Sequence, residues 1–198
     1  TICLFNLSSD WGGGEKWHVD VATYLTKRGY KVLSVSSDGS PFAQKMKGTG
    51  VKGYHFPIAN LGFLNPIRVL KLSRIFNKEG VGTLVTSLPS DMKAASIAAR
   101  EARVPNIIYR RGSAIPIRNT FLNRYLLRKV VTHIIANSLE VKRTILANNI
   151  RMVPEDKISI LYNGVNLALY SREAAPLYRA GENEIVLGSA GRLSEEKG

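Results

Sequence analysis

The chain has 198 residues, of which 44% are hydrophobic and 22% charged. These are the proportions of a globular protein with room for one substantial core, and they exclude a disordered chain. No apolar stretch approaches the roughly 18 residues of a membrane-spanning helix, and the single Cys3 excludes an internal disulfide or a cysteine metal cluster. We expect a cytoplasmic protein.

The positive charge is concentrated in one part of the sequence. The net charge is +13, and between Arg100 and Lys129 eight basic residues face a single acid, Glu101. Such a field attracts phosphates, whether on a nucleic acid, an anionic membrane surface or a phosphorylated substrate. Charge by itself does not choose among these partners.

Short runs rich in β-branched residues alternate with amphipathic segments of helical length. This alternation is typical of parallel strands joined by crossover helices. We therefore predict an α/β fold, a doubly wound, mostly parallel Rossmann-like sheet of about seven strands with helices on both faces. The predicted strands are Ile2–Leu7, Lys31–Ser36, Gly53–Pro57, Thr83–Ser87, Asn106–Arg110, His133–Asn137 and Ile158–Tyr162.

Capping residues mark several of the predicted helices. The first follows Gly14 and stops at Gly29; two more begin where a capping side chain precedes proline, at Ser40 and at Asn65. Others are expected at about 91–103 and, after a Ser138 cap, through Ala147.

Periodicity fades after the last of these strands. Asn163-Gly164 predicts a turn, and a further strand is expected at Ile185–Ser189, followed by a glycine turn. We predict an N-terminal domain over residues 1–165, a linker over 166–183 and the start of a truncated second domain over 184–198.

Three glycines, Gly12 to Gly14, lie between the first predicted strand and the first helix. Backbone N–H groups at such a helix N-terminus form an anion site in doubly wound folds. Trp17 occupies the place of the third glycine of the dinucleotide fingerprint, although Asp38 stands where its acid is expected, so a nicotinamide-dependent oxidoreductase or an epimerase remains an alternative. A tight turn that needs glycine for its dihedral angles is the structural alternative.

Four stretches together resemble family 4 glycosyltransferases of the GT-B fold. The first is Gly12-Gly13-Gly14-Glu15-Lys16 with its amphipathic helix, and the second is His133 to Ser138 with the helix that follows. The third, Lys157 to Asn166, is similar to the family's "pNGVD" segment, and the fourth, Gly191 to Gly198, to the "GRL…KG" that opens its second domain. These stretches cover nearly the whole chain in the family's order.

The resemblance implies a retaining transfer of a sugar from a nucleotide-diphosphate sugar, the donor, to an acceptor hydroxyl. It places Gly13 and Gly14 against the donor's diphosphate, with Arg192 and Lys197 as basic contacts. It implies no cofactor and no bound metal. The missing second domain would hold the rest of the donor site, and the catalytic residues stay unassigned.

One position departs from the family pattern. Many relatives carry a histidine near the end of the fifth strand, where this chain has Arg111 beside Arg110. Arginine stays protonated and cannot act as a base, so we expect it to bind an anionic group of a substrate. The expected acceptor or substrate contacts are Lys16, Arg110, Arg111, Ser138 and Asn163.

The expected pathway is envelope polysaccharide or glycolipid assembly, with a lipid-linked or saccharide acceptor. Basic residues spaced three or four apart over 68–78, and the basic, partly apolar segment 116–129, predict contact with the anionic inner face of a membrane. A nucleic-acid-binding protein is an alternative from another class, but the sequence has no recognisable reader motif. We expect no nucleic-acid partner.

Overall fold

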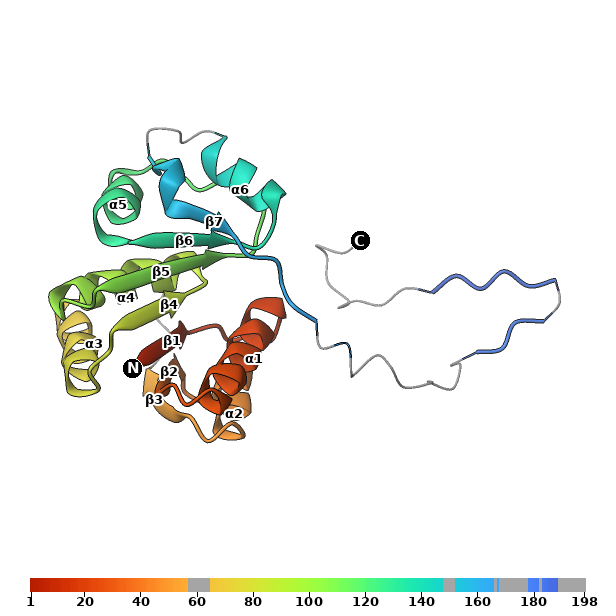
Figure 1. Ribbon diagram of the computed structural model, residues 1–198, viewed down its shortest axis with the longest axis horizontal. Coiled ribbons are helices and arrows are strands. Elements are labelled where there is room, and N and C mark those ends of the chain that lie inside the picture. The colour runs from red at the N-terminus through yellow and green to blue at the C-terminus, as the bar shows by residue number, and fades with distance from the viewer. Residues whose placement is uncertain (57–64, 148–151, 166, 168–177, 182, 189–198) are drawn as a thin grey trace. The chain divides into compact units, whose positions relative to one another are not determined.

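The computed structural model describes residues 1–56, 65–147, 152–165, 167, 178–181 and 183–188 (Figure 1). Contacts divide the chain into two units, Thr1–Asn163 and Gly164–Gly198. The first unit contains the whole sheet. The domain limits predicted from the sequence remain predictions.

A seven-stranded parallel sheet forms the centre of the first unit. Its strands lie in the order β3-β2-β1-β4-β5-β6-β7. Their bounds are Ile2–Asn6 for β1, Val32–Ser37 for β2, Lys52–Phe56 for β3, Thr83–Thr86 for β4, Asn106–Arg111 for β5, His133–Ala136 for β6 and Ile158–Ile160 for β7. The sequence prediction of a doubly wound α/β sheet is confirmed. The strand order reverses between β1 and β4, which is where such sheets open a crevice for ligands.

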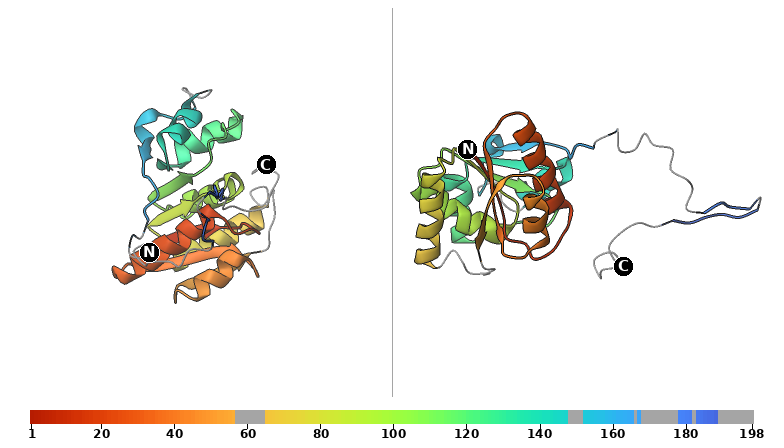
Figure 2. Two further views of the ribbon diagram at one scale, coloured as in Figure 1. Left: turned by 90° about the vertical axis from the view of Figure 1, so that its right-hand side faces the viewer. Right: turned by 90° about the horizontal axis from the view of Figure 1, so that it is seen from below.

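The helices form a layer on each face of the sheet. Their bounds are Gly13–Lys27 for α1, Pro41–Lys47 for α2, Pro66–Lys78 for α3, Pro89–Glu101 for α4, Phe121–Tyr125 for α5 and Leu139–Leu146 for α6. Helices α1 and α2 pack together, and α3 packs on α4 on the opposite side (Figure 2). We call these sides the α1 face and the α4 face.

The predicted helix caps are formed. The Ser40 and Ser138 hydroxyls each accept an N–H bond from the first turn of α2 and α6, and the Asn65 side chain does the same for α3. Proline stands at the first helical positions after Ser40 and Asn65, where its missing N–H costs no hydrogen bond. These local signals explain why the sequence located the helix starts well.

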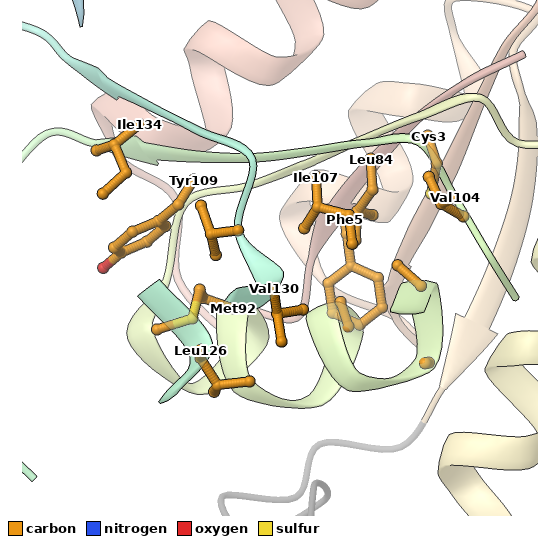
Figure 3. Packing of buried hydrophobic residues seen from close by; sticks show 14 of the residues in the cluster. Cys3, Phe5, Leu84, Met92, Val104, Ile107, Tyr109, Leu126, Val130 and Ile134 are labelled. Atoms are coloured by element: carbon orange, nitrogen blue, oxygen red, sulfur yellow. The ribbon is translucent and has the colours of Figure 1, made fainter. Parts of the chain in front are cut away.

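Two hydrophobic clusters fill the space between the sheet and its helices. The α1 face buries Leu4, Phe42 and Met46, among others, and the larger cluster on the α4 face includes Phe5 and Tyr109 (Figure 3). Neighbouring residues of one strand enter different clusters because side chains alternate between the two faces of a sheet. Cys3 is buried in the larger cluster, as a small core hydrophobe.

Three details differ from the sequence prediction. Helix α5 and the π-helical turn that follows it, Leu126–Val130, were not predicted as helices. The strand predicted at 185–189 is wrong over residues 185–188, which are not in a strand, and Ser189 lies outside the described residues. Ile185 and Leu187 are 90% and 93% exposed, so their side chains are not packed against a sheet in the part of the chain that the structure describes. In the described ranges no helix has both the length and the apolar character to cross a membrane.

Candidate substrate site at the carboxyl edge of the sheet

The glycine-rich loop joins the end of β1 to the start of α1. Gly12 is the N-cap of α1, and no side chain caps this helix end. An added Cβ at Gly13 or Gly14 would meet nothing within 4 Å, and neither glycine has a positive φ. The fold therefore does not require glycine at these two positions, so the structural alternative of a strained turn fails. An unblocked helix N-terminus offers N–H groups and a positive dipole end to an anion.

Buried and partly buried hydrogen bonds hold the base of this loop. The Asn6 side chain donates to Glu15 Oε1 at 2.9 Å, and its own oxygen accepts from Ser8 N at 2.8 Å. Leu7 N donates to Asp91 Oδ2 at 2.9 Å, and Ser37 donates to the Leu7 carbonyl at 2.7 Å. The loop is thus anchored to α1, β2 and α4, the elements next to the point where the strand order reverses.

Asp91 is the least expected member of this network. It is 2% exposed, and burial raises the pKa of its carboxyl to about 7, with a further increase from the Glu15 charge and opposing effects from the Leu7 and Ser90 donors. The sequence signal for it was an acidic residue in the first turn of the helix after β4. The sequence predicts only a helix from about residue 91, and α4 begins two residues earlier, at Pro89.

An aromatic and cationic group lies beside the loop on the α1 face. The Arg110 guanidinium carbon sits 4.7 Å from the centre of the Trp17 ring, and its Nη2 donates to Asn163 Oδ1 at 3.0 Å. Burial lowers the pKa of Arg110, while the nearby Glu15 carboxylate opposes that change. His18, next to Trp17, is fully buried, and both burial and the Arg110 charge bring its pKa down to about 3. This histidine is therefore neutral at physiological pH.

Arg110 and Arg111 do not form one anion site, although they are adjacent in β5. Arg111 faces the opposite layer, where its Nη1 donates to the Tyr109 hydroxyl at 3.0 Å and its Nη2 donates to the Ile115 carbonyl. Alternation along the strand separates the two guanidinium groups. Gly112 permits the position of Arg110, because a Cβ there would lie 2.9 Å from Arg110 Nη1.

Residues 11–169 match the sequence profile of Glycosyltransferase Family 4. The chain belongs to Glycosyltransferase Family 4. This match covers most of the chain, and it favours the resemblance seen in the sequence over an oxidoreductase or a nucleic-acid-binding protein. No curated protein sequence matches the chain.

Solved structures of glycosyltransferases share the fold of this family 4 chain. A glycosyltransferase from Rickettsia africae has 20% identity and a TM-score of 0.69, covering 86% of this chain and 44% of its own. HepE from Anabaena, solved with UDP and glucose, has 19% identity and a TM-score of 0.67, covering 85% and 46%. MurG from Acinetobacter baumannii has 13% identity and a TM-score of 0.58, covering 83% and 46%. The matched part of the chain therefore covers less than half the length of each of these proteins.

The remaining residues that the sequence assigned to the family 4 site occupy different positions. Lys16 lies on the exposed side of α1 and pairs with Asp20 at 2.5 Å, and the Ser138 hydroxyl caps α6 through Val141 N at 3.1 Å. Asn163 does join the group around Arg110. Arg192 and Lys197, the expected diphosphate contacts, lie outside the described residues.

Four residues that surround the glycine-rich loop and Arg110 were missed by the sequence analysis, namely Asn6, Glu15, Trp17 and Asp91. Their common signal is position, since each follows or faces the carboxyl end of β1 or β4. In the part of the chain that the structure describes, no cluster of three histidine, cysteine or acidic side chains is arranged to hold a metal ion.

Proposed function

We propose that this chain forms the acceptor-side half of a retaining glycosyltransferase that uses a nucleotide-diphosphate sugar as donor. The observation that carries the proposal is the free N-terminus of α1 at the switch point of the sheet, where Gly13 and Gly14 leave room that the fold itself does not need. The structure of HepE with UDP-glucose supports a donor of this class. No cofactor takes part.

The donor's diphosphate would lie against the N–H groups of Gly13 and Gly14. Arg192 and Lys197 would add positive charge from the donor-binding half, which suits a leaving group whose negative charge grows as its bond to the sugar breaks. The bond from the anomeric carbon to the diphosphate oxygen breaks as the acceptor oxygen bonds to that carbon on the same face. The departing diphosphate takes the acceptor's proton.

Arg110 is suited to a substrate oxygen beside the loop. It is 4% exposed, and its place is fixed by the Trp17 ring and Asn163. A guanidinium held in one orientation recognises an oxyanion without the entropy loss of ordering a free side chain. Ser138 and Lys16 would contribute from the edge of the site, because both already have partners in the structure.

The acceptor would be a saccharide or a lipid-linked glycan used in envelope polysaccharide or glycolipid assembly. Support comes from exposed apolar side chains that stand among cations on the layer of α3 to α5. Ile67 is 75% and Phe121 82% exposed, and Arg124 and Arg128 are exposed on the helical segment that begins at Phe121. Such surfaces bind anionic membranes, at about 1 kcal/mol per basic residue near the surface.

The enzymatic proposal is tested by assaying the complete gene product with a panel of nucleotide-diphosphate sugars. We expect release of the nucleoside diphosphate that depends on an acceptor, and an unchanged anomeric configuration in the product. The 198 residues alone should show no turnover, since the matched part of the chain covers less than half of each similar structure. Turnover by these residues alone, or inversion in the product, would contradict the proposal.

The membrane contact is tested by co-sedimentation with vesicles. Binding should rise with the fraction of anionic lipid, fall with salt, and weaken when Arg118, Arg124 and Arg128 are changed together to glutamine. Equal binding to neutral and anionic vesicles, or to neither, would leave these cations without a membrane role.

A further inference from the structure

A cavity of about 370 Å³ opens on the α4 face, where α4 begins and β5 ends. Met92 and the Tyr109 side chain line it from these two elements, and the segment after β5 adds Ile115 and Pro116. Most of its lining is apolar. Its volume falls at the lower end of the range for small-molecule sites, enough for one sugar ring or a comparable group.

Arg111 brings an unbalanced charge to this apolar cavity. The residue is 6% exposed, and within the described ranges no carboxylate lies at ion-pair distance from it. Its two Nη atoms bond to neutral partners, the Tyr109 hydroxyl and the Ile115 carbonyl. Its Nε is buried and has no hydrogen-bond partner among the residues described. A buried cation without a counterion is costly, so such a group indicates a bound anion.

Asn123 supplies a second unused polar atom at the same cavity. Its Nδ2 donates to the Arg118 carbonyl at 2.7 Å, which fixes the orientation of the amide. Its Oδ1 is buried and accepts no bond from the described residues. Arg111 and Asn123 both line the cavity, and each has one buried polar atom, Arg111 Nε and Asn123 Oδ1, that lacks a partner among the described residues. Lys93 and Arg118 also line it and add positive charge.

We propose that this cavity binds an acidic part of the acceptor, an oxyanion attached to a body that carries a hydroxyl. The carboxylate or phosphate would accept from Arg111 Nε, and the hydroxyl would donate to Asn123 Oδ1. The apolar walls would contact the C–H groups of a sugar ring or of a lipid chain. The assignment of this anion to the acceptor rests on the proposed function, whereas the binding of an anion in the cavity does not.

The test is calorimetry on the 198-residue chain with four probes: glucuronate, glucose 6-phosphate, geranyl phosphate and neutral glucose. We expect an anionic probe to bind at least tenfold more tightly than glucose. A sugar-borne anion is indicated by preference for the first two probes, and a lipid-borne anion by preference for geranyl phosphate. UDP binding at the glycine-rich loop is measured in parallel, so that failure of the cavity and failure of the donor site are seen separately.

Variants decide whether the binding belongs to this cavity. Arg111→Gln should lower the affinity for the anionic probe at least tenfold. Arg118→Glu should lower it at least fivefold, and because Arg118 is exposed this change will not prevent folding. Arg143→Gln on α6 is the matched control for loss of one surface charge, and it should leave the affinity within twofold. The proposal is overturned if no anionic probe binds more tightly than glucose, or if Arg118→Glu leaves the affinity for the anionic probe unchanged. It is also overturned if Arg143→Gln weakens that affinity as much as Arg118→Glu does.

Discussion

Two consecutive arginines of β5 are buried to nearly the same extent, yet their surroundings differ. Arg110 is 4% exposed and lies among a tryptophan ring, an asparagine and the field of Glu15. Arg111 is 6% exposed and contacts a hydroxyl and a carbonyl at an apolar cavity. The charge of Arg110 is partly balanced by the protein, whereas Arg111 has no comparable acid among the described residues. One strand thus presents positive charge to two regions of the carboxyl edge.

The difference suggests that the two faces bind different parts of the substrates. The α1 face carries the glycine-rich loop and a positioned arginine, which suits the fixed geometry of a diphosphate. The α4 face carries a cavity lined by Arg111, whose charge no described acid balances. Such a cavity suits the group that varies between acceptors. The predictions below test this division, beginning with the largest expected effect.

The glycine-rich loop is the region where a small change should cost most activity. Gly14→Val in the complete gene product should lower turnover at least about 100-fold, because the side chain would block N–H contacts to the diphosphate, each of which contributes about 1.5 to 3 kcal/mol. Stability should stay nearly constant, since the space at Gly14 is empty. Turnover and the melting temperature are the measurements.

Gly29→Ala provides the opposite control. Its φ of +82° disfavours any side chain, so the variant should lose about 1 to 2 kcal/mol of stability while the folded enzyme keeps its turnover. Full turnover of Gly14→Val would show that the loop is not the diphosphate site, and unfolding of this variant would show that the fold itself requires the glycine.

The two faces should also respond to pH in opposite directions. The folded pKa of Asp91, about 7, is above its usual 3.8, so its contribution to stability is complete below pH 4 and is lost as the pH rises to 7. The folded pKa of His18, about 3, is below its usual 6.5, so its contribution is present above pH 6.5 and is lost as the pH falls. Between pH 7 and pH 4 the two effects oppose each other.

Single variants separate these effects. On acidification from pH 7 to pH 4, Asp91→Asn should lose about 3 kcal/mol more stability than the parent chain, and His18→Gln should lose about 3 kcal/mol less. Urea unfolding at the two pH values measures both. The same pH dependence in all three proteins would show that neither buried group titrates as the structure indicates.

The smallest effect is the one that compares the arginines directly. Arg110→Gln should raise the KM for the donor about tenfold, and Arg111→Gln should raise the KM for the acceptor about tenfold, because each loses a charge-assisted bond of about 1.5 kcal/mol. Arg111→Lys keeps the charge but not the guanidinium, so its KM for the acceptor should lie between those of the parent enzyme and Arg111→Gln. If both glutamine variants affect the same substrate, the two faces do not have separate roles.

Local signals in the sequence were sufficient for most of the fold. Ser40 with Pro41 and Asn65 with Pro66 located helix starts because capping is a short-range effect. The predicted strand is not formed over residues 185–188, because apolar composition alone does not provide a neighbouring strand to pair with. The π-helical turn after α5 was missed because its apolar side chains are set by packing against α4, not by local propensity.

The candidate site could be predicted only in part. The glycines and the two arginines were found because each belongs to a motif next to a strand end. That Arg110 and Arg111 face apart follows from strand alternation and could have been expected from the sequence. The Asp91 bond to Leu7 joins residues 84 positions apart, and no local pattern predicts such a pair. The unbalanced charge of Arg111 likewise emerges only when the whole layer around it is assembled.

The most direct test of the account is an NMR titration of the isotopically labelled 198-residue chain with UDP-glucose. The account predicts weak binding with the largest amide shifts at Gly13, Gly14 and Glu15, since these N–H groups begin α1 and the donor-binding half supplies the other contacts. Glucose alone should leave the three signals unchanged. Shifts confined to other parts of the chain, or no shift at millimolar UDP-glucose, would contradict the claim that this helix end receives the donor's diphosphate.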